Sequence, residues 1–269
     1  ILDVRKHLKG TGIKIISKIE RAEAVRQGVL DEIIKASDAV MVARGDLGVE
    51  IPAEYVPIYQ KKIINLCNQY GKPVIVATQI LNSMVENPRP TRAETSDAAT
   101  AIFDHADSFL LTNETAVGKY PVEAVCTLAK VSSAVENELK RHPHLLTLKT
   151  PEDPSLTNAT CLNATKLAQD IHARYIVAIS RSGYTAREIA KYRPFIPIIV
   201  FTPDMHVERQ MSIVWGVRQS FTQWIHLNNP LPQIRKTLIS SELVKKGDEI
   251  VICNAGFGKK EKLITTTMI

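Results

Sequence analysis

Three charged residues in the first part of the chain have types and spacing that suit phosphoryl or enolate chemistry. Lys18 and Glu20 are two residues apart at the end of an apolar run, so on a strand both side chains point to the same face. Asp46 follows the next apolar run. Mg²⁺ is commonly held by one or two carboxylates, with water and substrate supplying its other oxygens. A lysine beside such a metal is placed to neutralise a transferring phosphoryl group or a developing enolate.

Polar residues follow all four of the first apolar runs. In order, they are Lys18 and Glu20, Arg44 and Asp46, Thr78 and Gln79, and Asn113 and Glu114. In (β/α)8 enzymes the carboxyl ends of the strands carry the active site, so the pattern predicts a site there. The two glycines after the second run would let backbone N–H groups approach a carboxylate or phosphate. The alternative for each pair alone is an exposed ion pair or an ordinary loop.

The elements that must position these residues alternate along the first half of the chain. Short apolar runs predict strands at 13–19, 39–43, 74–77 and 108–112. Helical spacing with Gly and Pro at the ends predicts helices at 24–36, 53–70, 94–103 and 121–139. The glycine-rich stretch 44–52 is expected to be a loop. Four successive βα units with apolar strands predict a parallel sheet covered by helices, and the polar strand ends favour a partial (β/α)8 TIM barrel.

The pattern changes after residues 142–154, which are rich in Pro, His and Thr and are expected to form a linker. Beyond them we expect helices at 156–172, 185–192 and 231–244, and strands at 175–179, 196–201, 216–219, 249–253 and 262–268. This order predicts a smaller α/β domain with a mixed sheet. The expected fold class is therefore α/β, with a partial barrel in residues 1–142 and the smaller domain in residues 143–269.

Composition excludes several classes of protein. Hydrophobic residues make up 45% and charged residues 23% of the 269, the balance of a soluble globular protein. Without a long apolar run or a signal peptide, we expect no membrane partner and a cytoplasmic location. The net charge of +6 suits an anionic substrate. The sequence has no basic stripe interleaved with aromatic residues, so we expect no nucleic-acid partner. The four cysteines lack metal-binding spacing and are expected to be buried and reduced.

Five long motifs resemble those of the pyruvate kinase family, in that family's order and spacing. They are IKIISKIE (13–20), SDAVMVARGDLGVEIP (37–52), GKPVIVATQ (71–79), PRPTRAE (88–94) and NETAVGKYPVEAV (113–125). The resemblance implies phosphoryl transfer from phosphoenolpyruvate to ADP, giving pyruvate and ATP in glycolysis. It also implies Mg²⁺ (or Mn²⁺) and K⁺ as cofactors, and a homotetramer for the full-length protein.

The matched motifs imply roles for particular residues. Lys18 corresponds to the lysine that stabilises the transferring phosphoryl group and the enolate, and Glu20 and Asp46 correspond to ligands of the divalent metal. Thr78 corresponds to a catalytic hydroxyl near the enolate carbon. The implied substrate-binding set is Ala43, Arg44, Gly45, Asp46 and Thr78.

The second half resembles the family's C-terminal effector and oligomerisation domain more loosely, through ISRSGYT (179–185) and the following YRP (192–194). Hydroxyls and backbone N–H groups at a helix N-terminus can hold an effector's phosphate, although a simple capped turn is the alternative. The candidate effector-phosphate residues are Ser180, Arg181, Ser182, Gly183 and Thr185. The GFGKK segment (256–260) is not a P-loop, because Cys253 stands at the upstream glycine position.

We expect the chain to be a fragment that does not turn over alone, since the resemblance begins in mid-barrel. The family's first strands, its lid domain and its nucleotide- and K⁺-binding residues have no counterpart in the sequence. Two local departures are Arg21, where asparagine is common, and Thr112-Asn113-Glu114 in place of Ser-Gly-Glu. The rivals are a Mg²⁺-dependent lyase or aldolase barrel, which needs no ADP, and a non-catalytic truncated paralogue that binds a metabolite or an oligomerisation partner.

Overall fold

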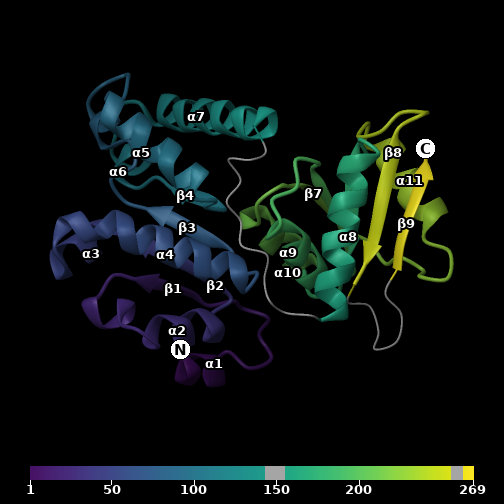
Figure 1. The fold of residues 1–269 in the computed structure, drawn as a ribbon, viewed down its shortest axis with the longest axis horizontal. Coiled ribbons are helices and arrows are strands. Elements are labelled where there is room, and N and C mark those ends of the chain that lie inside the picture. Colours follow the sequence, from purple (N-terminus) through teal and green to yellow (C-terminus); the bar gives the residue numbers. More distant parts are fainter. Residues whose placement is uncertain (143–154, 256–262) are drawn as a thin grey trace. The chain divides into compact units, whose positions relative to one another are not determined.

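The computed structural model describes residues 1–142, 155–255 and 263–269. The chain divides into two compact units, residues 1–149 and 150–269 (Figure 1). Apart from His142, the expected linker at 142–154 lies outside the described residues, and so does the segment 256–260. The expected domain boundary between residues 142 and 143 therefore stays a prediction.

The first unit is built on a parallel sheet in the order β1-β2-β3-β4. In the register of the sheet, Lys18 lies opposite Met41, and Ala43 lies opposite Ala77. The carboxyl ends of neighbouring strands therefore meet at one edge of the sheet. The strands are β1 (Ile16–Ile19), β2 (Ala39–Ala43), β3 (Val74–Ala77) and β4 (Ser108–Leu110).

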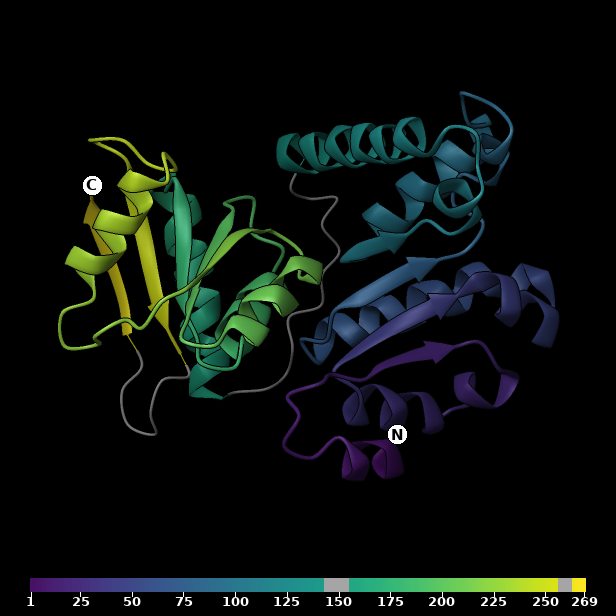
Figure 2. The same ribbon diagram turned by 180° about the vertical axis from the view of Figure 1, so that it is seen from behind.

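Helices precede, connect and follow these strands, and the longer ones cover one face of the sheet. The helices are α1 (Leu2–His7), α2 (Val29–Ala36), α3 (Arg44–Glu50), α4 (Val56–Gln69), α5 (Arg92–Phe103), α6 (Asn113–Ala116) and α7 (Pro121–Arg141), with 3-10 turns η1 (Ala22–Val25), η2 (Ala53–Tyr55) and η3 (Asn82–Val85). The core joins Val42 and Val76 of the sheet to Ile34 of α2 and Ile63 of α4. Helix α4 lies in front of the strands in Figure 1 and behind them in Figure 2.

Alternation along β1 places its residues on two different faces. Ile19 is fully buried in the helix-covered core, whereas Ile16 and Lys18 belong to the other face and are exposed. A strand whose helix-free face is exposed can present a charged side chain without the cost of desolvating it. The fold thus leaves Lys18 available for chemistry.

Two segments of the first unit differ in type from the sequence-based expectation, and β1 and β4 are shorter than the predicted 13–19 and 108–112. The stretch 44–52, expected as a loop, is mostly helix α3, because Leu47 is fully buried and packing overrides the low helix propensity of Gly45 and Gly48. The expected helix 24–36 is two elements, η1 and α2, because Gly28 adopts a left-handed conformation with φ of 83°. The short helices α1 and α6 were not predicted.

The second unit has a five-stranded sheet in the order β7-β6-β5-β8-β9. The strands are β5 (Tyr175–Ile179), β6 (Ile198–Thr202), β7 (Val217–Thr222), β8 (Glu249–Asn254) and β9 (Leu263–Met268). Neighbouring strands are parallel except β9, which runs antiparallel to β8. The sheet is therefore mixed, and together with the parallel sheet of the first unit this confirms the predicted α/β class.

Alternate residues of β5 enter two separate cores in the second unit. Ile176 and Ala178 pack on the side of α8 (Leu156–Asp170), α9 (Tyr184–Ala190) and α10 (Met205–Gln210). Val177 and Ile179 pack on the side of α11 (Leu231–Ser240). The 3-10 turn η5 (Met211–Ile213) follows α10. This unit therefore has three layers, helices on both faces of one sheet.

Two expectations about whole-chain properties can be compared with the described residues. None of the helices in them has the length and apolar character that crossing a membrane requires. Cys67, Cys161 and Cys253 are buried free thiols, as expected, but Cys126 is exposed. That expectation was wrong for Cys126, because it lies on the part of α7 where Val122 and Val125 are also exposed.

Candidate active site

The structure brings Lys18, Glu20 and Asp46 together at the carboxyl ends of β1 and β2. Lys18 Nζ lies 2.6 Å from Glu20 Oε2 and 3.9 Å from Asp46 Oδ2. The three side chains are 52%, 36% and 63% exposed, so the cluster opens to solvent and to any ligand. Lys18 and Glu20 converge because they are two residues apart, and Asp46 joins them because β2 pairs with β1 in parallel.

The charges of this cluster favour an ammonium at Lys18. A hydrogen bond to Glu20 and the attraction of that carboxylate raise the pKa of Lys18, and Asp46 adds to the effect. Lys18 therefore carries its positive charge at neutral pH and serves as an electrostatic partner for anions. In this protonated state it has no lone pair with which to act as a base.

Thr78 belongs to the same edge of the sheet and is held against the end of β2. Gly45 N donates a hydrogen bond to Thr78 Oγ1 at 2.7 Å, and that hydroxyl donates to Ala77 O at 2.6 Å. A Cβ on Gly45 would lie 3.4 Å from Thr78 Oγ1, an ordinary contact distance, so the two segments pack closely here. The structure therefore brings the ends of β1, β2 and β3 together, as the sequence predicts.

The backbone after β3 is strained. Thr78 and Gln79 have φ values of 67° and 52°, in the left-handed region that β-branched residues such as threonine strongly avoid. The expected cost is about 1–2 kcal/mol for each residue. Such strain persists only where surrounding contacts over-determine the conformation, and it is often found at functional sites.

Arg44 supplies those contacts, a role that its motif does not predict. Its side chain is buried and turned into the protein, away from the Lys18 cluster. Its guanidinium donates hydrogen bonds to the carbonyl oxygens of Thr78 and Gln79 and to the side chains of Asp97 and Gln60. The Arg44 guanidinium is therefore engaged within the protein, and Ala43, which is 1% exposed, is buried as a whole residue.

Glu114, one of the polar residues expected at a strand end, braces the site from behind. It is 1% exposed, and its carboxylate accepts hydrogen bonds from Leu81 N at 3.0 Å and Thr112 N at 2.9 Å. These bonds tie the loop after β3 to the loop after β4. Glu114 therefore has a structural position, and no local sequence signal separates it from the exposed carboxylates.

The donor set fits a hard divalent cation. Glu20 and Asp46 flank the same lysine and offer carboxylate oxygens, the ligands that Mg²⁺ and Mn²⁺ prefer. Within residues 1–142, 155–255 and 263–269, no three or more His, Cys, Asp or Glu side chains form a metal-binding group on their own. A two-carboxylate site of this kind would complete its shell with water and substrate oxygens. No described residue is assigned to K⁺.

The predicted effector loop lies between β5 and α9 of the second unit. Arg181 and Ser182 are exposed, whereas Thr185 is fully buried and Ser180 is 2% exposed, with its Oγ accepting a hydrogen bond from Thr185 N. Gly183 has a φ of 74°, which explains the glycine. Helix α9 has seven residues, Tyr184–Ala190, and begins and ends earlier than the predicted 185–192. Three of the five candidate residues, Ser180, Gly183 and Thr185, are thus buried.

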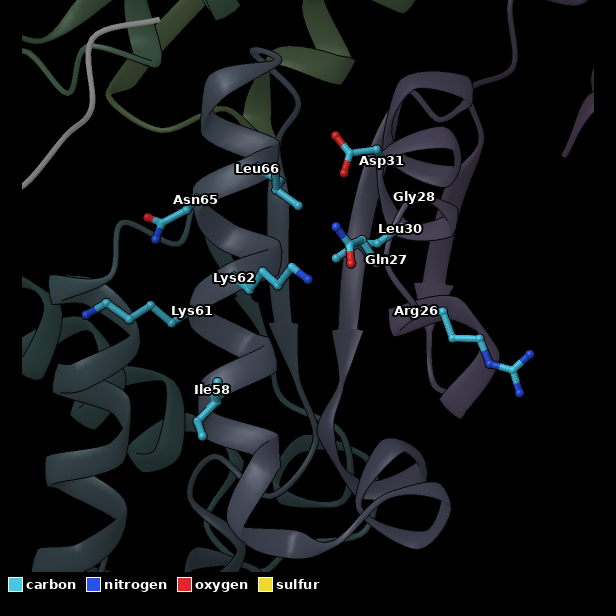
Figure 3. Close-up of a pocket in the computed structure, with 10 residues that line it drawn as sticks. All are labelled: Arg26, Gln27, Gly28, Leu30, Asp31, Ile58, Lys61, Lys62, Asn65 and Leu66. Atoms are coloured by element: carbon cyan, nitrogen blue, oxygen red, sulfur yellow. The ribbon is translucent and has the colours of Figure 1, made fainter.

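A cavity of about 610 Å³ lies elsewhere, on the helix-covered side of the first unit, and contains none of the predicted site residues (Figure 3). Leu30 of α2 and Ile58 and Leu66 of α4 supply its apolar lining. Its polar lining residues come from the same region, and among them Lys61 is paired with Asp104 at 2.8 Å. The strand-end cluster differs from this cavity in that charged side chains from the ends of β1 and β2 converge there.

The fold and the cluster together define a class of protein: an α/β protein whose parallel strands carry a charged site at their carboxyl ends, as (β/α)8 enzymes do. Comparison with known families agrees. Residues 1–125 match the model described as "Pyruvate kinase, barrel domain", and residues 158–268 match "Pyruvate kinase, alpha/beta domain". The chain belongs to the pyruvate kinase family, which confirms the resemblance of its motifs.

Individual relatives give the same result. The chain is 44% identical to a pyruvate kinase of Clostridium acetobutylicum, covering 94% of this chain and 54% of that protein. It is also 44% identical to one of Geobacillus stearothermophilus, covering 94% and 43%. A crystal structure of a pyruvate kinase from Cryptosporidium parvum superposes with a TM-score of 0.87 at 34% identity, covering 99% of this chain and 56% of that one. The chain thus spans about half the length of these relatives.

Proposed function

We propose that this chain supplies the phosphoryl-transfer residues of a pyruvate kinase, which moves the phosphoryl group of phosphoenolpyruvate to ADP and gives pyruvate and ATP in glycolysis. The observation that carries the proposal is the position of Lys18 between the carboxylates of Glu20 and Asp46. A cation beside two carboxylates at the carboxyl ends of parallel strands suits an anionic substrate whose charge moves during reaction.

In the proposed reaction, the bond between phosphorus and the enol oxygen breaks, and a bond between phosphorus and a β-phosphate oxygen of ADP forms. The Lys18 ammonium stabilises the negative charge that moves from the phosphoryl group to the enolate oxygen. The Thr78 hydroxyl lies at the same edge of the sheet, where the enolate carbon takes up a proton to give pyruvate. Gly45 N–H is bonded to the Thr78 hydroxyl and positions it, and the backbone N–H of Asp46 completes the substrate-binding set.

A divalent cation, Mg²⁺ or Mn²⁺, would be held by Glu20 and Asp46 and would supply Lewis-acid stabilisation of phosphoryl and enolate oxygens. The K⁺ requirement of the family is proposed for the complete enzyme.

We infer that the isolated chain does not turn over. A (β/α)8 barrel has eight strands, whereas the described part of the first unit has a four-stranded sheet with β1 and β4 at its edges. Partners of this sheet must come from elsewhere before a closed barrel can bind both substrates. For the complete enzyme we propose a cytoplasmic homotetramer, with the exposed part of the 180–185 loop receiving the phosphate of an effector.

Complementation tests the proposal. The chain is assayed for pyruvate from phosphoenolpyruvate, with and without ADP, alone and coexpressed with the part of the Clostridium acetobutylicum pyruvate kinase that it does not match. We expect ADP-dependent pyruvate only from the coexpressed pair. Pyruvate without ADP would indicate a lyase, and an assembled but inactive pair would indicate a non-catalytic paralogue. Robust turnover by the chain alone would contradict the inference that it needs the rest of the barrel.

A further inference from the structure

We propose that Arg44 is a positioning residue that holds Thr78 in its reactive place, with Asp97 as the residue that orients Arg44. This inference rests on the proposed function for its catalytic meaning, but its structural content can be tested without turnover. It assigns to the arginine side chain a role distinct from substrate contact.

All five N–H groups of the Arg44 guanidinium have acceptors. Nε and Nη2 donate to Thr78 O at 3.3 and 2.9 Å, and Nη2 also donates to Gln79 O at 3.0 Å. Nη1 donates to Asp97 Oδ2 at 2.6 Å and to Gln60 Oε1 at 3.3 Å. The planar fork thus spans the end of β3 on one side and helices α4 and α5 on the other. A lysine, with three donors around one nitrogen, cannot reproduce this pattern.

The carbonyl groups that Arg44 holds belong to the two left-handed residues, Thr78 and Gln79. With neither residue a glycine, the chain itself does not favour this conformation, so external bonds must select it. The conformation matters because it aims the Thr78 hydroxyl at Gly45 N. Without the fork, we expect the loop to relax toward an ordinary extended conformation and the hydroxyl to leave that position.

Arg44 also connects the Thr78 hydroxyl to Asp46, a proposed ligand of the divalent metal. Arg44, Gly45 and Asp46 form the first turn of α3, in which the arginine side chain points inward and Asp46 points toward Lys18. Fixing the arginine therefore fixes the direction of the whole turn. Asp97, from α5, balances the charge of a guanidinium that is only 8% exposed.

The structural test uses the 269-residue chain and nuclear magnetic resonance of backbone amides. In Arg44→Met and Arg44→Lys, we expect the Cα and Cβ shifts of Thr78 and Gln79 to move toward ordinary extended values. We also expect the Gly45 amide to exchange at least about tenfold faster, because its protecting bond opens locally. Asp97→Asn should give the same change at smaller amplitude.

The matched control is Arg5→Met. Arg5 also donates to a backbone carbonyl, Ala36 O at 2.7 Å, and to a carboxylate, Asp38 at 3.0 Å, but at the opposite end of the strands. It should leave the shifts of Thr78 and Gln79 unchanged. If Arg44→Met folds and leaves Thr78, Gln79 and Gly45 as in the parent chain, the positioning role is wrong. If Arg44→Met fails to fold, Arg44→Lys and Asp97→Asn decide the question.

The catalytic test uses the complemented enzyme. A displacement of about 1 Å at a reacting group can cost about 10²-fold in rate, so Arg44→Lys should lower kcat by about that factor while KM for phosphoenolpyruvate changes less than about threefold. A raised KM with unchanged kcat would instead indicate a substrate-binding side chain and overturn the proposal. Should the parent assembly lack activity, the proposed function fails, whereas the amide measurements still decide the role of Arg44.

Discussion

The ammonium of Lys18, in β1, lies 3.9 Å from a carboxylate oxygen of Asp46, in the helix that follows β2. This distance exists because β1 and β2 are parallel neighbours whose carboxyl ends meet at one edge. Because the Lys18 ammonium interacts with the carboxylates of Glu20 and Asp46, an anionic substrate could replace one of them as its partner.

Removing the charge of Lys18 should remove most of the catalysis. In the complemented enzyme, Lys18→Met is expected to lower kcat by at least about 10²–10³-fold, because a charge that stabilises the transition state is lost. Lys14→Met is the matched control, since Lys14 lies just before the same strand and pairs with Asp38 at 3.9 Å. Steady-state kinetics with phosphoenolpyruvate measure both variants. Activity of Lys18→Met near that of Lys14→Met would refute the role of Lys18.

The carboxylates of Glu20 and Asp46 should determine the affinity for a divalent metal. Glu20→Gln and Asp46→Asn are each expected to weaken Mn²⁺ binding by at least about tenfold, because neutral amides are poorer ligands for a hard cation. Electron paramagnetic resonance of free Mn²⁺ measures the affinity in the chain itself. Glu54→Gln, at an exposed glutamate of the same unit, is the control. Equal affinities in all three variants would place the metal elsewhere.

Glu114 should matter for stability. Glu114→Gln replaces a buried carboxylate oxygen with an NH₂ group that faces a backbone donor, Leu81 N or Thr112 N. We expect a loss of about 1–3 kcal/mol in the free energy of unfolding, measured with urea. Glu123→Gln, an exposed glutamate on α7, should change this value by less than about 0.5 kcal/mol. A neutral effect of Glu114→Gln would mean that the brace contributes nothing.

Glu94 should contribute to the pH dependence of stability. Burial alone would raise the pKa of Glu94, but hydrogen bonds from Ser83 and Thr91 outweigh it, so the pKa is lowered from its usual 4.5. Because the folded-state pKa is the lower one, its stabilisation is complete above pH 4.5 and is lost as the pH falls through the folded value. Urea unfolding between pH 7 and pH 3 should therefore show a shallower acid loss in Glu94→Gln. Parallel curves for the variant and the parent chain would contradict this linkage.

Much of the fold follows from local pattern. The apolar runs at 39–43, 74–77 and 175–179 are strands with those bounds, because short β-branched runs between helical stretches have few other ways to bury themselves. The helices 94–103 and 121–139 were also found, each two residues longer at one end. The capping box of Thr91 and Glu94 begins the first of these, which is a purely local signal.

The candidate site was predicted in part for the same reason. Lys18 and Glu20 share a face by strand alternation, and a parallel order of strands brings Asp46 and Thr78 to their edge. The sequence thus determined which residue types stand at the strand ends and, through its motifs, the family to which the chain belongs. Their functional roles stay predictions until the variants are measured.

Only the tertiary structure decided where Arg44 and Glu114 point. Both are polar residues that follow a strand, as the residues of the open site do. In the structure, however, both are buried and form hydrogen bonds with backbone groups. The left-handed Thr78 and Gln79 are equally invisible in the sequence, since neither is glycine. Their conformation depends on the guanidinium of Arg44, in α3, and on the residues of α4 and α5 that bind this guanidinium. Contacts between residues far apart in the chain decide such features, and local spacing carries no record of them.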